Sequence, residues 1–143
     1  MFNTTHLHPM IVHFPVALIL VGFLADVVYL FVKKEICLSK MGLFLMVLGT
    51  LGAGAAFLTG NLFTVEPTEG SMVEIFERHE TLALVTLLIM SIGTLIRLGM
   101  IIFKKDKPLF RWLVFGLYFL GALSVGATGF LGGSMVMDYM IGL

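Results

Sequence analysis

The stretch His8-Pro9-Met10-Ile11-Val12-His13-Phe14-Pro15 opens an apolar run that continues to Val32 with Asp26 as its one charged residue. Three further apolar blocks follow along the chain. Each block reaches the ~20 residues that cross the ~30 Å hydrocarbon core of a bilayer. Backbone groups in lipid must bond within their own segment, and the blocks are too long and too continuous for barrel strands. We therefore predict an all-α integral membrane four-helix bundle, a single domain over residues 1–143 with spans at about residues 9–32, 41–63, 80–103 and 109–133.

The composition favours a membrane protein. Hydrophobic residues make up 59% of the chain and the mean hydropathy is +1.05, far above the values of soluble domains. The formal net charge is zero, so nucleic acid is not an expected partner. Cys37 is the only cysteine, which excludes an intrachain disulfide and a paired-cysteine metal motif. The expected partners are the lipid bilayer and other membrane protein subunits or a second copy of the chain.

The basic residues predict the orientation. Eight of the nine lysines and arginines flank the first and third connections: Lys33, Lys34, Lys40, Arg97, Lys104, Lys105, Lys107 and Arg111. The second connection is acidic. Short loops rich in lysine and arginine stay in the cytoplasm. We predict an N-out/C-out, multi-pass protein of the bacterial inner (cytoplasmic) membrane, with every histidine on the outer, periplasmic side. No cleavable signal peptide is expected, because no basic residue precedes the first apolar block.

The histidines at this outer side are the candidate ligand residues. His8 and His13 are five residues apart, a rotation of about 140° on a helix, so they do not share one face. Either they serve two neighbouring ligands, or one binds and the other orients. Pro15 either bends the first helix or marks its regular start. Ionisable groups within membrane-spanning segments are commonly functional. We therefore take His13, His79 and His8 as candidate cofactor or metal ligands.

Polar residues near these histidines are candidates for supporting them. Glu77 and Glu80 flank His79 at the start of the third helix, where acidic residues also favour the helix dipole. A carboxylate bonded to a ring nitrogen would fix the tautomer of a ligating histidine. Asp138 and Tyr139 lie at the same side, near the C-terminus.

Two other charges fall within the predicted spans. Asp26 lies late in the first helix, and Arg97 lies at a comparable depth in the third. A structural ion pair between the two helices is the preferred interpretation. The alternative is that Asp26 relays protons, although no second buried acid continues such a path.

Glycine and alanine gather in the second and fourth helices. They stand four residues apart at Gly52, Ala56 and Gly60, at Ala122 and Gly126, and at Gly129 and Gly133. Small residues at this spacing allow membrane helices to approach closely. The alternative is that they leave a slot for a flat cofactor. Histidines in the first and third helices and glycines in the second and fourth would suit a repeated hairpin, but the sequence similarity is too weak to establish one.

The opening motif, Asp26 and the pair Gly132-Gly133 resemble a family of small bacterial four-helix membrane proteins of unknown function. Its members open with His-Pro-x-x-Val-His-Phe-Pro, which residues 8–15 match in full. Their common ending carries a tyrosine where this chain has Met137 and a histidine where it has Tyr139. The family's four histidines imply a haem or metal site at the outer face, with two bis-histidine haems at most. The three that this chain keeps imply one haem, between His13 and His79, or none.

We predict a small b-type cytochrome-like protein that binds haem b near the outer face. Its function would be electron transfer with a periplasmic redox partner or a quinone, within a larger membrane complex. His13 and His79 satisfy the minimum for haem in a helical bundle, two axial ligands from separate helices. One alternative is a non-catalytic accessory subunit of a respiratory or photosynthetic complex. Another is a copper or zinc site that uses His8, His13, Met10, Met135 and Met137. No nucleophile elbow, phosphate loop or His-Glu-x-x-His string indicates a hydrolytic enzyme.

Overall fold

The computed structural model describes residues 7–64, 67–68, 70 and 72–140. It contains four helices: α1 (Leu7–Phe31), α2 (Ile36–Phe63), α3 (Met72–Ile102) and α4 (Pro108–Met140). All four are long and apolar enough to cross a membrane. The prediction of an all-α four-helix membrane bundle is therefore confirmed.

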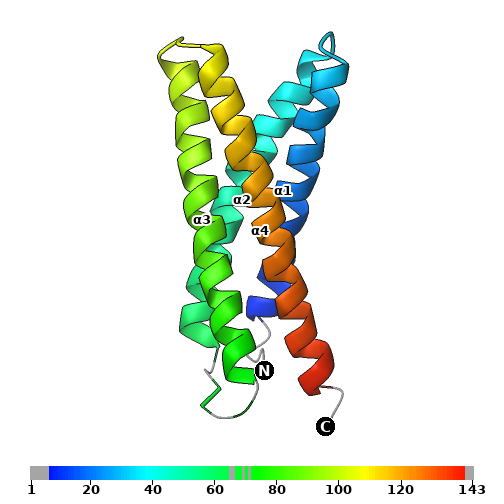
Figure 1. Cartoon of the computed structure of the whole chain (residues 1–143), viewed down its shortest axis with the longest axis vertical. Coiled ribbons are helices and arrows are strands. Elements are labelled where there is room, and N and C mark those ends of the chain that lie inside the picture. The colour runs from blue at the N-terminus through cyan, green and yellow to red at the C-terminus, as the bar shows by residue number, and fades with distance from the viewer. Residues whose placement is uncertain (1–6, 65–66, 69, 71, 141–143) are drawn as a thin grey trace.

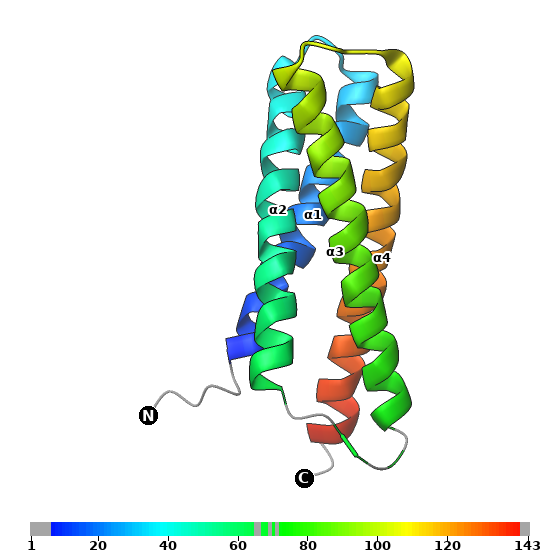
Figure 2. The ribbon, with the colours of Figure 1, turned by 90° about the vertical axis from the view of Figure 1, so that its left-hand side faces the viewer.

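The helices run antiparallel in two hairpins, α1–α2 and α3–α4 (Figure 1). The connections 32–35 and 103–107 lie at one end of the bundle, here called the basic end because Lys33, Lys34, Lys104 and Lys105 lie there. The N- and C-termini and the connection between α2 and α3 lie at the opposite end, here called the histidine end after His8 and His79 (Figures 1 and 2). Each helix packs against two neighbours, since α1 and α3 both contact α2 and α4.

All four helices begin before the predicted spans, and the difference is largest in α2 and α3. α2 starts at Ile36 rather than residue 41, and α3 starts at Met72 rather than residue 80. In α3 the added turns carry three exposed charged residues, Glu74, Glu77 and Arg78. Glu74 lies in the first turn, where its charge complements the helix dipole, and it pairs with Arg78 one turn later at 2.6 Å. Hydropathy marks the part of a helix that lies in lipid, whereas helix formation continues for as long as the local sequence supports it.

Helix α1 passes through Pro15 without ending there. The proline is buried against α2, where a Cβ placed on Gly52 would lie 3.4 Å from Cδ of Pro15. Of the two predicted starts, the helix follows the earlier one. His8 and His13 therefore both lie on regular helix.

The core lies at mid-height and takes one fully buried side chain from each helix: Ile19, Met46, Met90 and Tyr118. Most of the remaining large apolar side chains point outward. Phe44 and Leu51, for example, are each 66% exposed. Such a surface is compatible with lipid and incompatible with water.

The two hairpins repeat each other's contacts. Residues of α3 follow their counterparts in α1 by 71 positions, and residues of α4 follow those in α2 by 72. Within the hairpins Gly49 lies against Ile19 as Gly121 lies against Met90, and between them Gly22 lies against Tyr118 as Gly93 lies against Met46. The connection 103–107 is one residue longer than 32–35, which accounts for the difference in spacing. The bundle is therefore two copies of one hairpin, related by an approximate two-fold axis along its length.

Candidate functional site: a pair of oriented histidines

His8, half-buried on α1, is held by α2. Its Nδ1 lies 3.2 Å from the hydroxyl oxygen of Thr59. That hydroxyl directs its own proton to the carbonyls of Ala55 and Ala56, each at 3.0 Å, so the Thr59 oxygen accepts from His8. The proton of the neutral ring is therefore on Nδ1. Its Nε2 keeps a lone pair that no hydrogen bond within the described chain uses.

His79, half-buried on α3, is held by α4 in the same way. Its Nδ1 donates to the backbone carbonyl of Thr128 at 3.0 Å. Because a carbonyl only accepts, this bond alone assigns the proton to Nδ1 and leaves the lone pair on Nε2. An Nδ1–H bonded to a backbone carbonyl or another acceptor is the usual arrangement behind a histidine that ligates a metal through Nε2.

The two rings also pack alike. A Cβ placed on Gly60 would lie 3.1 Å from Cε1 of His8, and one placed on Gly132 would lie 3.2 Å from Cε1 of His79. In both cases the next nearest ring atom is Nδ1, at 3.5 and 3.6 Å. Each histidine thus places the same ring edge on a glycine of its hairpin partner.

His13 lies outside this arrangement. Its side chain is exposed, and its Nδ1 donates to the carbonyl of Pro9 in its own helix at 2.6 Å. His8 and His13 occupy different faces of α1, as their five-residue spacing predicts. The structure therefore brings His8, not His13, to the half-buried position that matches His79.

Neither Glu77 nor Glu80 makes a hydrogen bond to a histidine ring among the described residues. Glu77 and Glu80 are exposed, and the hydrogen bond of His79 goes to Thr128 instead. The side chains of Asp138 and Tyr139 lie outside the residues that the structure describes.

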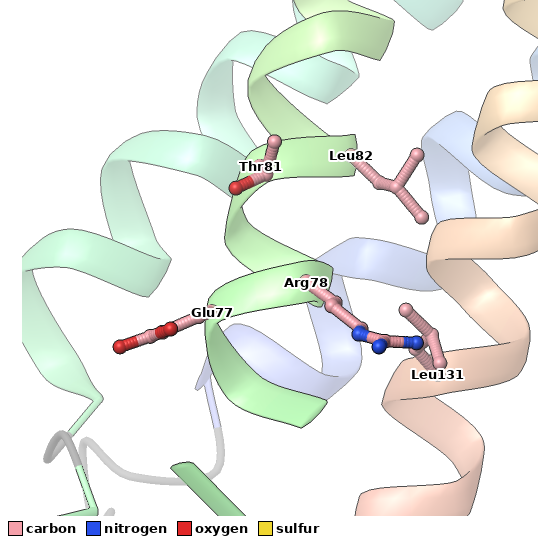
Figure 3. A pocket seen from close by; sticks show the side chains of 5 residues that line it. All are labelled: Glu77, Arg78, Thr81, Leu82 and Leu131. Atoms are coloured by element: carbon pink, nitrogen blue, oxygen red, sulfur yellow. The ribbon is translucent and has the colours of Figure 1, made fainter. Parts of the chain in front are cut away.

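An open pocket lies beside α3, and neither His8 nor His79 lines it. It has a volume of about 410 Å³ and is lined by Glu77, Arg78, Thr81, Leu82 and Leu131. In Figure 3 Glu77 and Arg78 point to opposite sides of α3, and Arg78 extends toward Leu131 of α4. Because Arg78 is exposed and already pairs with Glu74, the pocket does not resemble a built binding site.

The copper alternative receives less support from the geometry. Met10 is 65% exposed and Met137 is 63% exposed, so both point away from the half-buried rings. Within the described part of the chain, no group of three or more histidine, cysteine, aspartate and glutamate side chains is arranged to hold a metal ion. Among the described residues at the histidine end, the half-buried imidazoles are those of His8 and His79.

At the other end, Asp26 and Arg97 form an ion pair between α1 and α3. Two guanidinium nitrogens of Arg97 donate to the two carboxylate oxygens, the Nη2–Oδ1 distance being 2.9 Å. Arg97 also donates to the carbonyl of Ser39 at 3.0 Å, and the carboxylate lies against Gly42 of α2. The side chains are only 11% and 14% exposed. The carboxylate and the guanidinium are paired with each other, so this cluster ties α1 to α3. It offers no unpaired charge for proton transfer.

Among the described residues, the polar contacts between the hairpins lie in the basic half of the bundle and at its middle. Besides the Arg97 cluster they comprise the Thr50–Thr94 hydroxyl pair at 2.8 Å and the Tyr118 hydroxyl near the Gly42 carbonyl at 3.5 Å. From Thr50 toward the histidine end, the hydrogen bonds among the described residues stay within one hairpin. These are His8–Thr59, His79–Thr128 and Thr86–Ser124. The two histidines therefore lie where no described hydrogen bond joins the hairpins.

Sequence reasoning did not find Thr59 and Thr128. It treated Gly60 as a residue that packs the helices or leaves a slot for a cofactor, and Gly132 as part of the family resemblance. The available signal was the spacing: His8 and His79 are 71 residues apart, as are Asp26 and Arg97, and Gly60 and Gly132 are 72 apart. A search for that repeat would have paired His79 with His8.

Comparison with protein families gives one match. The family model described as "Predicted membrane protein (DUF2231)" matches residues 4–143. No curated protein and no solved structure matches the chain.

Proposed function

The chain belongs to the DUF2231 family of predicted membrane proteins, and we propose that it is a small b-type cytochrome-like protein. His8 and His79 would hold haem b at the histidine end of the bundle, and the bound haem would carry electrons. The supporting observation is that both imidazoles are half-buried, oriented through Nδ1 and left with Nε2 as a free donor.

The donor set suits a haem better than a bare metal ion. Haem iron already has four nitrogens from its porphyrin and needs only two axial ligands, which histidines from separate helices supply. A bare zinc or copper ion takes three or four protein ligands, more than the described residues gather here. The bound haem would supply reversible one-electron chemistry. The residues of this chain would fix the ligand tautomers and set the polarity around the iron.

The fold gives this function a setting. By the positive-inside rule, the basic residues of the connections 32–35 and 103–107 favour a cytoplasmic position for that end. The haem would then lie near the periplasmic face of a bacterial inner membrane. At that depth its partners would be a periplasmic redox protein or a quinone. The exposed apolar sides of the bundle would face lipid or neighbouring subunits of a larger complex.

The test is a reduced-minus-oxidised visible spectrum of the detergent-purified protein, with a pyridine haemochrome assay for haem per chain. We expect a sharp b-type α-band that the double variant H8A/H79A loses. The matched control is H13A, which removes an exposed histidine of the same helix and should keep the band. A colourless wild-type protein, expressed with haem available, would refute the proposal.

A second candidate is a non-catalytic accessory subunit of a respiratory or photosynthetic complex. It is favoured by the broad exposed apolar surface. Phe44 and Leu51 of α2 and Leu123 of α4 are each more than half exposed. Mild-detergent isolation from native membranes distinguishes the two. A colourless chain in stoichiometric association with redox subunits would favour the accessory function.

A further inference from the structure

The approximate two-fold axis makes His8 and His79 counterparts. They are 71 positions apart, the same spacing as Ile19 to Met90 and Gly22 to Gly93. Their glycine contacts, Gly60 and Gly132, obey the spacing of 72 that relates α2 to α4. Two residues related by the axis are in equivalent positions relative to a ligand that lies on the axis.

At the basic end, a pair of counterpart residues from the two hairpins is in direct contact. Asp26 and Arg97, also 71 positions apart, meet across the axis in a buried ion pair. At the histidine end each counterpart is bonded to its own hairpin, and no described hydrogen bond connects the two. A ligand with two open coordination positions along one line would complete the connection there.

We infer that His8 and His79 are equivalent ligands of one transition-metal centre per chain, which joins the two hairpins at the histidine end. The inference rests on the proposed function in taking the same two histidines as ligands, and it adds to that function a stoichiometry and an equivalence. One iron per chain would be bound by one histidine from each hairpin. The step is ligation alone: two Nε2 lone pairs bind the metal, and no proton leaves because both rings carry theirs on Nδ1.

This arrangement also predicts a mechanical effect. The hairpins are tied in the basic half by Arg97–Asp26 and Thr50–Thr94 and are held beyond it only by apolar contacts such as Gly129 with Val16. Binding of the metal centre should therefore protect the histidine end more than the basic end in amide hydrogen exchange.

The first experiment titrates haemin into the full-length apoprotein in detergent and follows the Soret band. We expect saturation at one haemin per chain. H8A and H79A should each weaken binding by at least about tenfold and to a similar extent, and H8M and H79M should each restore a six-coordinate spectrum, because methionine is also an axial ligand. Saturation at two haemins per chain, or dependence on only one histidine, would overturn the inference and leave the proposed function standing.

A second experiment does not depend on haem. In a C37S background with a protease site inserted between α2 and α3, a flexible bismaleimide should link H8C/H79C, so that the two hairpins remain together after cleavage. H13C/H79C is the matched control and should separate, since His13 points outward. Linking of the control but not of the pair would contradict the placement of the two histidines.

Co²⁺ separates the two proposals. If haemin does not bind but Co²⁺ binds at one per chain and requires both histidines, the shared centre stands and the haem function falls. If neither haemin nor Co²⁺ binds, both proposals are refuted.

Discussion

The two ends of the bundle differ in how counterpart residues of the two hairpins interact. At the basic end, counterparts of the two hairpins carry opposite charges and meet in an ion pair whose side chains are 11% and 14% exposed. At the histidine end, counterparts are identical, neutral and bonded within their own hairpins. Opposite charges can satisfy each other, whereas two identical donors of lone pairs cannot. The first pair joins the two hairpins directly, whereas the second pair would suit the shared acceptor that we propose.

The largest effect is expected from breaking the ion pair. R97A leaves the Asp26 carboxylate buried without its partner, so it should destabilise the protein by about 3 kcal/mol or more. The double variant D26L/R97M removes both charges and should recover most of that loss. Thermal unfolding in detergent, followed by circular dichroism, measures both. A double variant as unstable as R97A would show that the Asp26–Arg97 cluster stabilises the protein by more than the pairing of its charges.

The next largest effect is expected at the glycines that support the histidines. G60A and G132A each add a methyl group 3.1–3.2 Å from a ring carbon, so the imidazole must shift. Haemin affinity should fall by about tenfold in each variant, similarly to the loss of an outer-shell contact at a metal site. The control is G126A, whose methyl group would enter open space and should leave haemin affinity unchanged. Unequal effects of G60A and G132A would weaken the two-fold comparison.

A smaller effect is expected from Thr59, which orients only one of the two rings. T59V keeps the shape of the side chain and removes the oxygen that accepts from His8. The lost hydrogen bond should cost about 1 kcal/mol and shift the haem midpoint potential, because a less oriented ring is a weaker ligand. T59S should restore the potential. No shift in T59V would mean that the Thr59 bond does not act on the ligand.

The smallest effect is expected at the exposed ion pair of the basic end, Asp106 with Arg111. The hydrogen bond from Arg111 lowers the pKa of the Asp106 carboxyl below its ordinary value of 3.8. The pair therefore contributes above that value, and its contribution is lost as the pH falls through the lowered pKa. Both side chains are more than half exposed, so D106N should change the melting temperature at pH 7 very little, and less still in high salt. A large fall in the melting temperature would mean that the connection 103–107 also stabilises the bundle.

Much of the fold followed from the sequence, because lipid allows few solutions. Four apolar blocks predicted four helices, and the depth of Asp26 and Arg97 anticipated the pair that the structure forms. The site was less accessible to such reasoning. Helical spacing separated His8 from His13 onto different faces, but it did not say which face is covered by α2. That depends on Thr59 and Gly60, fifty residues further along the chain, and their relation to His8 becomes visible only when the two helices pack.

Electron paramagnetic resonance of the oxidised, haem-loaded protein tests the central claim most directly. We expect a single low-spin haem signal, because two histidines ligate the iron, at one spin per chain. H8A and H79A should each convert it to a high-spin signal, while H13A should leave it unchanged. A low-spin signal that survives in H8A or H79A, or one that H13A abolishes, would contradict the claim that one histidine from each hairpin holds the iron.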